Sequence, residues 1–322
     1  MRLDNETLRQ LTIGAVYEEE NDEGLSFYKC TPKQIDAWFS HSEFLGNGAG
    51  CSTGIRLDFH TNSKNITFAT PKEGKYELWI EGVLRHQVIF GGDSEIKAGD
   101  PVSFSLCDAL GAEKEDIHVT LHLPSHSRGA ISYIELDDGA YARRHEFDMK
   151  LLIIGDSITQ GWNSVYDSYS YAYHVSRFFN AESVIQGIGG SYFHEDTFDQ
   201  LPFEPDAVTI AYGTNDFGHY ATTEEMRAHT GAYLDLIQKE YAGKKIFVIS
   251  PIWRTPKEKP MGSFADCRGV VIEEAKKRGL IHIDGLSLMP PFEDLYTDGL
   301  HPNLTGFGIY GVNLCRELSK HL

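Results

Sequence analysis

The sequence is poor in cysteine. Its 322 residues include only five cysteines, an odd number, and they are widely scattered. No two of them have the spacing of a zinc site or a redox motif, so we expect neither a disulfide framework nor a cysteine-based metal site. Such cysteine usage is typical of a reducing compartment. The five are Cys30, Cys51, Cys107, Cys267 and Cys315.

Long apolar runs are also missing. No stretch approaches the roughly 20 apolar residues needed to cross a bilayer. The N-terminus, MRLDNETLRQLTIG, lacks the apolar core of a secretory signal. We therefore expect a cytoplasmic protein, although a signal peptide removed ahead of Met1 would leave the same sequence.

Positive charge is scarce. The chain has 29 Lys and Arg residues against 47 Asp and Glu residues, a formal net charge of −18. An acidic surface repels nucleic-acid phosphates and anionic membranes, so neither is an expected partner. Neutral or cationic small molecules remain open as ligands, as does homo-oligomerisation, while the simplest interpretation of the charge is solubility alone.

Helical periodicity is almost absent from the first half of the chain. Seven segments alternate apolar and polar residues with the period of a strand, and turn-forming residues separate them. They are STGIRLDFHT, KNITFAT, KYELWIEGV, LRHQVIF, PVSFSL, DIHVTLHL and AISYIELDD. Many short strands predict a β-sandwich or jelly roll, here over residues 1–147. The strand-rich pattern ends at about Asp138, and the charged stretch GAYARRHEFDMK that follows this residue is interpreted as the linker.

From Lys150 onward, apolar strands alternate with helical patterns. The predicted buried strands are KLLIIGDS, SVIQGIGG, DAVTIAYG, KKIFVISP and LIHIDG. Helical spacing appears at 170–179, at 223–241, in SFADCRGVVIEEAKKRG and in LTGFGIYGVNLCRELSKHL. This alternation predicts an α/β domain over residues 148–322, with a parallel sheet between two helical layers.

Four short motifs follow predicted strands or connecting turns: GDSIT at 155–159, GIGG at 187–190, GTND at 213–216 and DGLHPN at 298–303. The carboxyl ends of parallel strands border one crevice, so we expect these motifs to lie near each other. Each motif taken alone has a simpler explanation as a helix cap or a turn.

The residue types in these motifs suit acyl transfer. A serine such as Ser157 is a weak nucleophile until a base removes its proton, and histidine is the base best matched to neutral pH. A carboxylate is needed to orient that histidine, and Asp298 precedes His301 by three positions. The motifs together therefore predict a serine ester hydrolase. Asp156 and Asp216 are expected to stiffen the turns they occupy.

The four motifs resemble the conserved blocks of the SGNH, or GDSL-type, hydrolase superfamily, over about Lys150 to Leu322. The resemblance implies that Ser157 is the nucleophile, His301 the general base and then acid, and Asp298 its orienting carboxylate. It also implies that no metal or organic cofactor is required.

The resemblance further implies an oxyanion hole. Its donors would be the N–H of Ser157, the N–H of Gly190 and the side-chain amide of Asn215, with Gly189 as the alternative if the glycine turn is shifted by one. The sequence departs from the family here, since many members have an asparagine shortly before the glycine block where this chain reads VIQ.

The order of the two predicted domains is similar to that of bacterial two-domain carbohydrate esterases of the acetylxylan-esterase type, which join a jelly roll to an SGNH domain. This resemblance implies removal of acetyl or other short acyl groups from a small-molecule or oligosaccharide ester. Four residues near the motifs are candidate substrate contacts, with core packing as their commoner role: Trp162, Tyr192, His194 and Trp253.

Two other kinds of function stay open. The first is a broad short-chain carboxylesterase, thioesterase or lysophospholipase. The second is a carbohydrate-binding protein built on an inactive hydrolase scaffold. The intact set of serine, asparagine, aspartate and histidine argues against the second, because a scaffold has no physical need for all four.

Overall fold

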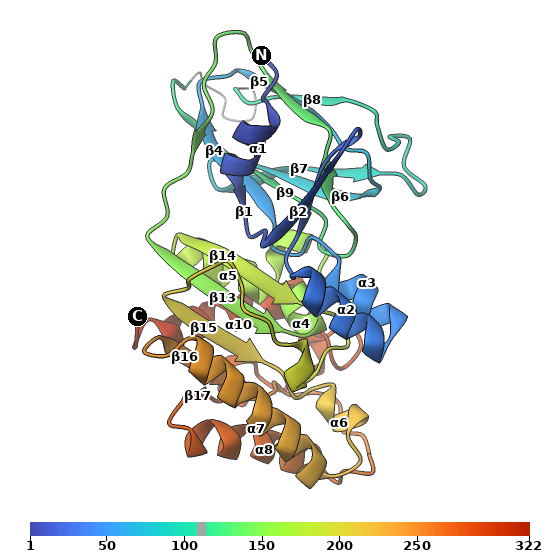
Figure 1. Cartoon of the computed structure of the whole chain (residues 1–322), viewed down its shortest axis with the longest axis vertical. Coiled ribbons are helices and arrows are strands. Elements are labelled where there is room, and N and C mark those ends of the chain that lie inside the picture. Colours follow the sequence, from blue (N-terminus) through green and yellow to red (C-terminus); the bar gives the residue numbers. More distant parts are fainter. Residues whose placement is uncertain (108–113) are drawn as a thin grey trace. The chain divides into compact units, whose positions relative to one another are not determined.

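Figure 1 shows the computed structural model of the chain, which describes residues 1–107 and 114–322. The chain forms two compact units. The first comprises Met1–Cys30 and Gly50–Phe147, and the second comprises Thr31–Ala49 and Asp148–Leu322. Residues 31–49 therefore group with the hydrolase-like unit, whereas the sequence analysis placed the whole of 1–147 in the N-terminal domain.

The first unit is built from antiparallel strands, as expected for an all-β domain. Its largest sheet has the order β1 (Thr12–Ile13), β4 (Arg56–Thr61), β9 (Ile117–His122), β6 (Gly74–Ile80) and β7 (Val83–Phe90), with β12 (Arg143–Arg144) also paired to β4. A second sheet has the order β10 (Ala130–Ile131), β3 (Gly24–Tyr28) and β2 (Tyr17–Asn21). A third has the order β11 (Tyr133–Leu136), β5 (Asn65–Ala69) and β8 (Val102–Ser105).

The period-two alternation of the strands decides which side chains enter the core of the first unit. Leu57 and Phe59 of β4 and Leu121 of β9 are fully buried in one apolar cluster. Their neighbours in sequence, such as Asp58 and His60, point to the opposite face of the sheet. The polar face of β4 and β9 is therefore a direct product of the alternating pattern.

Two local features of the first unit differ from the sequence-based expectation. Helix α1 (Asn5–Leu11) begins at Asp4, whose carboxylate accepts the N–H of Thr7 at 2.8 Å. The stretch interpreted as a linker contains β12, and Arg144 of this strand pairs with Phe59. Two-residue strands carry too little pattern to be seen in a sequence.

The second unit contains the predicted parallel sheet. Its strand order is β14 (Ala181–Gly187), β13 (Met149–Gly155), β15 (Ala207–Ala211), β16 (Lys245–Ile249) and β17 (Ile281–Ile283). Strand β13 is buried from Leu151 to Gly155, which explains its continuous apolar run.

Helices cover both faces of this sheet (Figure 1). The buried side chains of α5 (Tyr171–Phe178) and α10 (Leu304–Leu318) share one core with Leu151 and Ile153. Helices α7 (Thr223–Glu240) and α8 (Phe264–Lys277) pack against each other. The expected three-layer α/β architecture is confirmed.

Two helices that were not predicted complete the second unit. Helix α2 (Pro32–His41) begins with a capping box, in which the side chains of Thr31 and Gln34 each accept the other's backbone N–H. Helix α3 (Glu43–Ala49) follows directly. Gln34 and Gln186 of β14 exchange side-chain hydrogen bonds at 2.9 and 3.3 Å, which ties α2 to the edge of the sheet.

None of the helices in the described ranges is long and apolar enough to cross a bilayer. In the part of the chain that the structure describes, none of the five cysteines forms a disulfide bond.

Candidate active site

Ser157 lies at the carboxyl end of the central strand β13. The chain turns at Asp156, which caps the short helix α4 (Ser157–Gln160) by accepting the N–H of Ile158 at 2.9 Å. Ser157 is the first residue of this helix, so its N–H has no intrahelical acceptor. The side chain is only 5% exposed. The GDSIT motif therefore folds into the strand–turn–helix that the sequence predicted.

Ser157, His301 and Asp298 come together. The hydroxyl of Ser157 lies 2.8 Å from Nε2 of His301. Nδ1 of His301 lies 2.8 Å from Oδ2 of Asp298. His301 and Asp298 belong to the turn between η3 (Glu293–Leu295) and α10. The turn connecting η3 to α10 thus meets the end of β13, which is distant in sequence.

Asp298 is held as a carboxylate. Burial raises its pKa, but hydrogen bonds from the N–H and ring of His301 and from the N–H of Leu300 outweigh burial, so its pKa is lowered. A carboxylate only accepts hydrogen bonds, so Nδ1 of a neutral His301 carries the proton. Nε2 is then free to accept the proton of the Ser157 hydroxyl.

Asn163 supports this carboxylate and was not singled out in the sequence. Its side-chain amide donates to Oδ2 of Asp298 at 3.1 Å. The residue has φ = 65°, a left-handed conformation that asparagine tolerates better than most residues. The loop after α4 is thereby bent so that this amide reaches Asp298.

The three donors predicted from the family resemblance occupy adjoining turns. Gly190 has φ = 82°, which favours glycine. The side-chain amide of Asn215 donates to the carbonyl of Ser191 at 2.9 Å, which leaves its second N–H for another acceptor. The N–H of Gly189, the alternative donor, is already bound to Oε1 of Gln160 at 2.7 Å. The geometry therefore favours Gly190 over Gly189.

Gln160 organises the glycine turn. It is 2% exposed, and its Oε1 accepts hydrogen bonds from the N–H of Gly189 and from Nε1 of Trp162, the second at 2.9 Å. A Cβ on Gly189 would lie 2.7 Å from Nε1 of Trp162, which explains the need for glycine there. Nothing in the sequence marked Gln160, because its role depends on a turn 29 residues away.

Trp162 is the one candidate substrate contact that lies beside the histidine. Its ring is stacked near His301, with centroids 6.1 Å apart and an interplanar angle of 28°. It also meets Phe44 of α3, edge to face, with ring centroids 6.1 Å apart. The side chain of Phe44 is 56% exposed. Together these two rings form an aromatic wall next to the proposed proton-transfer pair.

Tyr192 and His194 instead belong to a histidine cluster of the second unit. The hydroxyl of Tyr192 lies 2.6 Å from Nδ1 of His41, and its ring stacks on His219 at 3.6 Å. Nδ1 of His194 lies 2.6 Å from Oδ1 of Asp196. The ring of His194 also meets that of His41, with centroids 4.6 Å apart, so both residues connect α2 to the loop after β14.

Trp253 follows β16 and packs on Tyr296, with ring centroids 5.0 Å apart. It also borders a surface hollow of about 670 Å³, whose lining includes Arg254 and Phe264. Ser157 and His301 do not line this hollow. Trp253 therefore contributes to the packing around Tyr296 and to one edge of this hollow.

The two aspartates expected to stiffen turns do so. Asp216 is fully buried and accepts the N–H groups of Phe193 and Gly213 at 3.0 and 2.9 Å, which joins the glycine block to the asparagine block. Burial raises the pKa of Asp156 and of Asp216 to about 7 each. Arg254, a further residue not predicted, donates to the carbonyl of Thr214 at 3.0 Å.

Residues 153–309 match the GDSL-like lipase/acylhydrolase family, and this part of the chain belongs to it. The protein is accordingly an enzyme of the carboxylic ester hydrolase class. The curated protein sequences include no significant match.

Several solved structures share the fold across both units. The salicylyl-acyltransferase SsfX3 from a tetracycline biosynthetic pathway has a TM-score of 0.79 at 19% identity, over 96% of this chain and 94% of its own. A family two carbohydrate esterase from Clostridium thermocellum, in complex with cellohexaose, has a TM-score of 0.67 at 16% identity, over 96% and 98%. An acetyl xylan esterase from the rumen bacterium Butyrivibrio proteoclasticus has a TM-score of 0.65 at 13% identity, over 99% and 98%.

Proposed function

We propose that the protein removes acetyl or another short acyl group from a carbohydrate ester, with Ser157 as nucleophile. The observation that carries this proposal is the continuous chain of contacts from Ser157 through His301 to Asp298, with 2.8 Å at each step. Such a chain is the arrangement that makes a serine hydroxyl reactive.

The reaction follows from these positions. Ser157 attacks the ester carbonyl while Nε2 of His301 takes its proton. The negative oxygen that forms is held by the N–H groups of Ser157 and Gly190 and by the amide of Asn215, at about 3 kcal/mol per donor. His301 then protonates the departing alcohol, and an acyl group remains on Ser157. Water, deprotonated by His301, attacks this acyl-enzyme and releases the acid.

Two features favour a sugar as the alcohol. The aromatic wall of Trp162 and Phe44 offers a flat, partly exposed apolar surface beside His301, which delivers the proton to the leaving group. Such a surface suits the C–H face of a sugar ring. Of the proteins that share the fold, one is named as a carbohydrate esterase and another as an acetyl xylan esterase.

A second candidate is transfer of the acyl group to an alcohol instead of water. It is favoured by the high structural similarity to a protein named as an acyltransferase. Both reactions share the acyl-enzyme on Ser157 and differ only in the acceptor. Product analysis with and without added oligosaccharide distinguishes them, because a transferase forms more acylated sugar than free acid.

The nucleophile is tested with Ser157→Ala, assayed with p-nitrophenyl acetate and with a fluorophosphonate probe. We expect loss of turnover and of labelling, with folding unchanged by circular dichroism. Ser287→Ala is a matched control, since that exposed hydroxyl only bonds the carbonyl of Asp284. Wild-type activity in Ser157→Ala would refute the assignment. Folded wild-type protein that reacts with neither reagent would favour the carbohydrate-binding alternative.

The substrate class is tested separately with p-nitrophenyl esters of increasing chain length and with defined acetylated oligosaccharides. We expect acetate to be the best simple ester and an acetylated oligosaccharide to be better still. Activity that rises steadily with chain length would contradict the proposal and favour a broad carboxylesterase or lysophospholipase. A preference for acyl thioesters would favour a thioesterase.

A further inference from the structure

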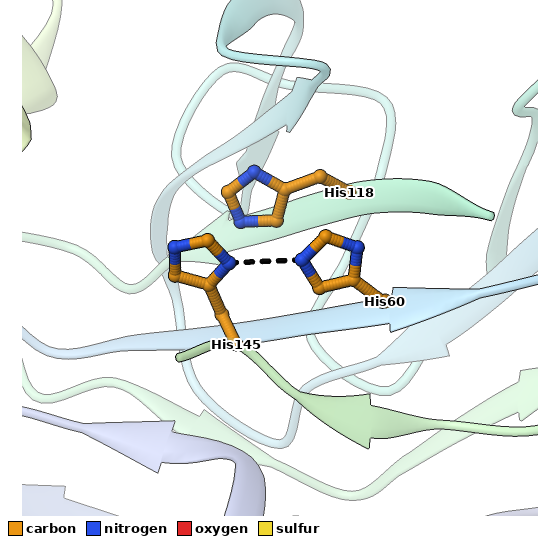
Figure 2. A group of neighbouring side chains, drawn as sticks. All are labelled: His60, His118 and His145. Atoms are coloured by element: carbon orange, nitrogen blue, oxygen red, sulfur yellow. Dashed lines mark hydrogen bonds between the residues drawn. The ribbon is translucent and has the colours of Figure 1, made fainter. Parts of the chain in front are cut away.

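Three histidines of the first unit meet on the polar face of its largest sheet. His60 of β4 and His118 of β9 are direct cross-strand partners. His145 follows β12, on the other side of β4, and its N–H donates to the carbonyl of Asp58 at 3.1 Å. The register of three adjacent strands thus brings the three side chains together, as Figure 2 shows.

The three imidazole rings are close and nearly parallel. The centroid of the His118 ring lies 4.8 Å from that of His60 and 4.2 Å from that of His145. Nε2 of His60 lies 2.9 Å from Nδ1 of His145, the contact drawn dashed in Figure 2. One nitrogen from each of the three rings lies within 4.8 Å of the others. Nitrogens bound to one tetrahedral Zn²⁺ ion lie about 3.3–3.4 Å apart, so small rotations of the three rings would bring these atoms onto a single ion.

Electrostatic repulsion favours the neutral form of the three imidazole rings. Three cationic imidazoles at this separation would repel each other strongly, whereas neutral ones each offer a lone pair. A divalent cation placed among the three rings can accept one lone pair from each of them.

Carboxylates stand beside two of the three rings. Oδ1 of Asp58 lies 2.6 Å from Nε2 of His118, and Arg56 holds the other oxygen of that buried carboxylate at 2.8 Å. Oδ2 of Asp116 lies 3.1 Å from Nδ1 of His60, without the alignment of a hydrogen bond. Carboxylates behind ligating histidines orient the rings and increase their basicity in metal sites.

We propose that His60, His118 and His145 bind a divalent transition-metal ion such as Zn²⁺, each through one ring nitrogen. Imidazole nitrogen is a preferred ligand of zinc, and three histidines are a common zinc-ligand set. Two of the ligands lie on paired strands, so the site is largely formed before the metal binds. Its effect is structural, because the metal fastens the chain segment at His145 to β4 and β9.

The proposal is tested on the full chain after treatment with a chelator and dialysis. Zn²⁺ is titrated in competition with a chromophoric chelator, and Co²⁺ is used to record the d–d absorption of histidine ligation. We expect one equivalent of tightly bound Zn²⁺ at this site and a rise in Tm on binding. His145→Asn and His118→Asn are expected to weaken binding by more than about 100-fold, because even residues behind the ligands contribute about 10–100-fold. Asp116→Asn is expected to weaken it about tenfold.

Two controls separate this site from other histidines. His86→Asn removes a histidine of the same unit that only stacks on Phe104. His194→Asn disrupts the histidine cluster of the second unit, which also brings histidines and carboxylates together. Both variants are expected to bind Zn²⁺ as tightly as wild type. The proposal is overturned if wild-type protein binds no Zn²⁺, if folded His145→Asn binds it as tightly as wild type, or if His194→Asn abolishes the only binding observed.

Discussion

Replacing Gln160 by methionine tests how the glycine turn is held. Methionine has nearly the same length and volume as glutamine, so Gln160→Met removes the acceptor oxygen while leaving little cavity. Two donors then lose their partner, the N–H of Gly189 and Nε1 of Trp162. Gly189 is buried, whereas Trp162 is partly exposed and can turn its N–H toward water.

The magnitude follows from the buried donor. An unpaired buried N–H costs about 1–3 kcal/mol, and we expect the free energy of unfolding to fall by about that amount. Gly190, the next residue, carries one of the proposed oxyanion donors. If about 1.4 kcal/mol of the loss falls on the transition state, kcat drops about tenfold. KM should change less, because the oxyanion forms only after substrate binds.

The assay is steady-state hydrolysis of p-nitrophenyl acetate together with urea unfolding. Gln238→Met is the matched control, since that side chain lies on the surface of α7 and donates to the carbonyl of Arg278. We expect the control to behave as wild type in kcat and KM. A Gln160→Met variant with wild-type kcat would show that the glycine turn does not depend on this hydrogen bond.

Three further predictions concern the carboxylate. Asp298→Asn should lower kcat by about 10⁴-fold, as the corresponding change does in a serine protease, because it favours the wrong tautomer of the histidine; a loss below tenfold would show that another group orients His301. Asn163→Gly keeps the left-handed backbone but removes the amide bonded to Asp298, so kcat should fall by about 2–10-fold, in line with one hydrogen bond of about 0.5–1.5 kcal/mol. Asn163→Ala should in addition lower Tm through backbone strain, and equal Tm values for the glycine and alanine variants would contradict the strain argument. The pKa of Asp298 is lowered on folding, so its contribution to stability is present above its unfolded pKa near 4 and is lost as the pH falls through the folded value. In urea unfolding at a series of acidic pH values, the free energy of unfolding should therefore fall less for Asp298→Asn than for wild type. An equal dependence of that free energy on pH in the two proteins would refute this.

Much of the fold could be predicted because its signals are local. The strands of the first unit follow from strict alternation, and the buried parallel strands follow from apolar runs such as that of β13. The helices α2 and α3 could not be assigned to their unit, because helical pattern says nothing about which core a segment joins. Gln34 and Phe44 acquire their roles only through partners in the second unit.

The same distinction holds for the candidate site. Ser157, Asp298 and His301 could be singled out as candidates because acyl transfer requires those residue types, and each lies in a motif at a strand end or in a connecting turn. Gln160 holds the glycine turn and Asn163 holds Asp298 through side-chain hydrogen bonds that depend on loop geometry, so no spacing rule reveals them. His60, His118 and His145 are likewise far apart in sequence, and only the pairing of β12, β4 and β9 brings them together.

The passage of residues 31–49 into the second unit means that the chain enters each unit twice. No single cut can therefore release an intact hydrolase module: a fragment starting at Asp148 would lack α2 and α3, leaving Gln186 and Tyr192 without their partners on α2. During synthesis, α2 and α3 leave the ribosome before most of the first unit does. They therefore emerge well before the rest of the second unit, to which they belong.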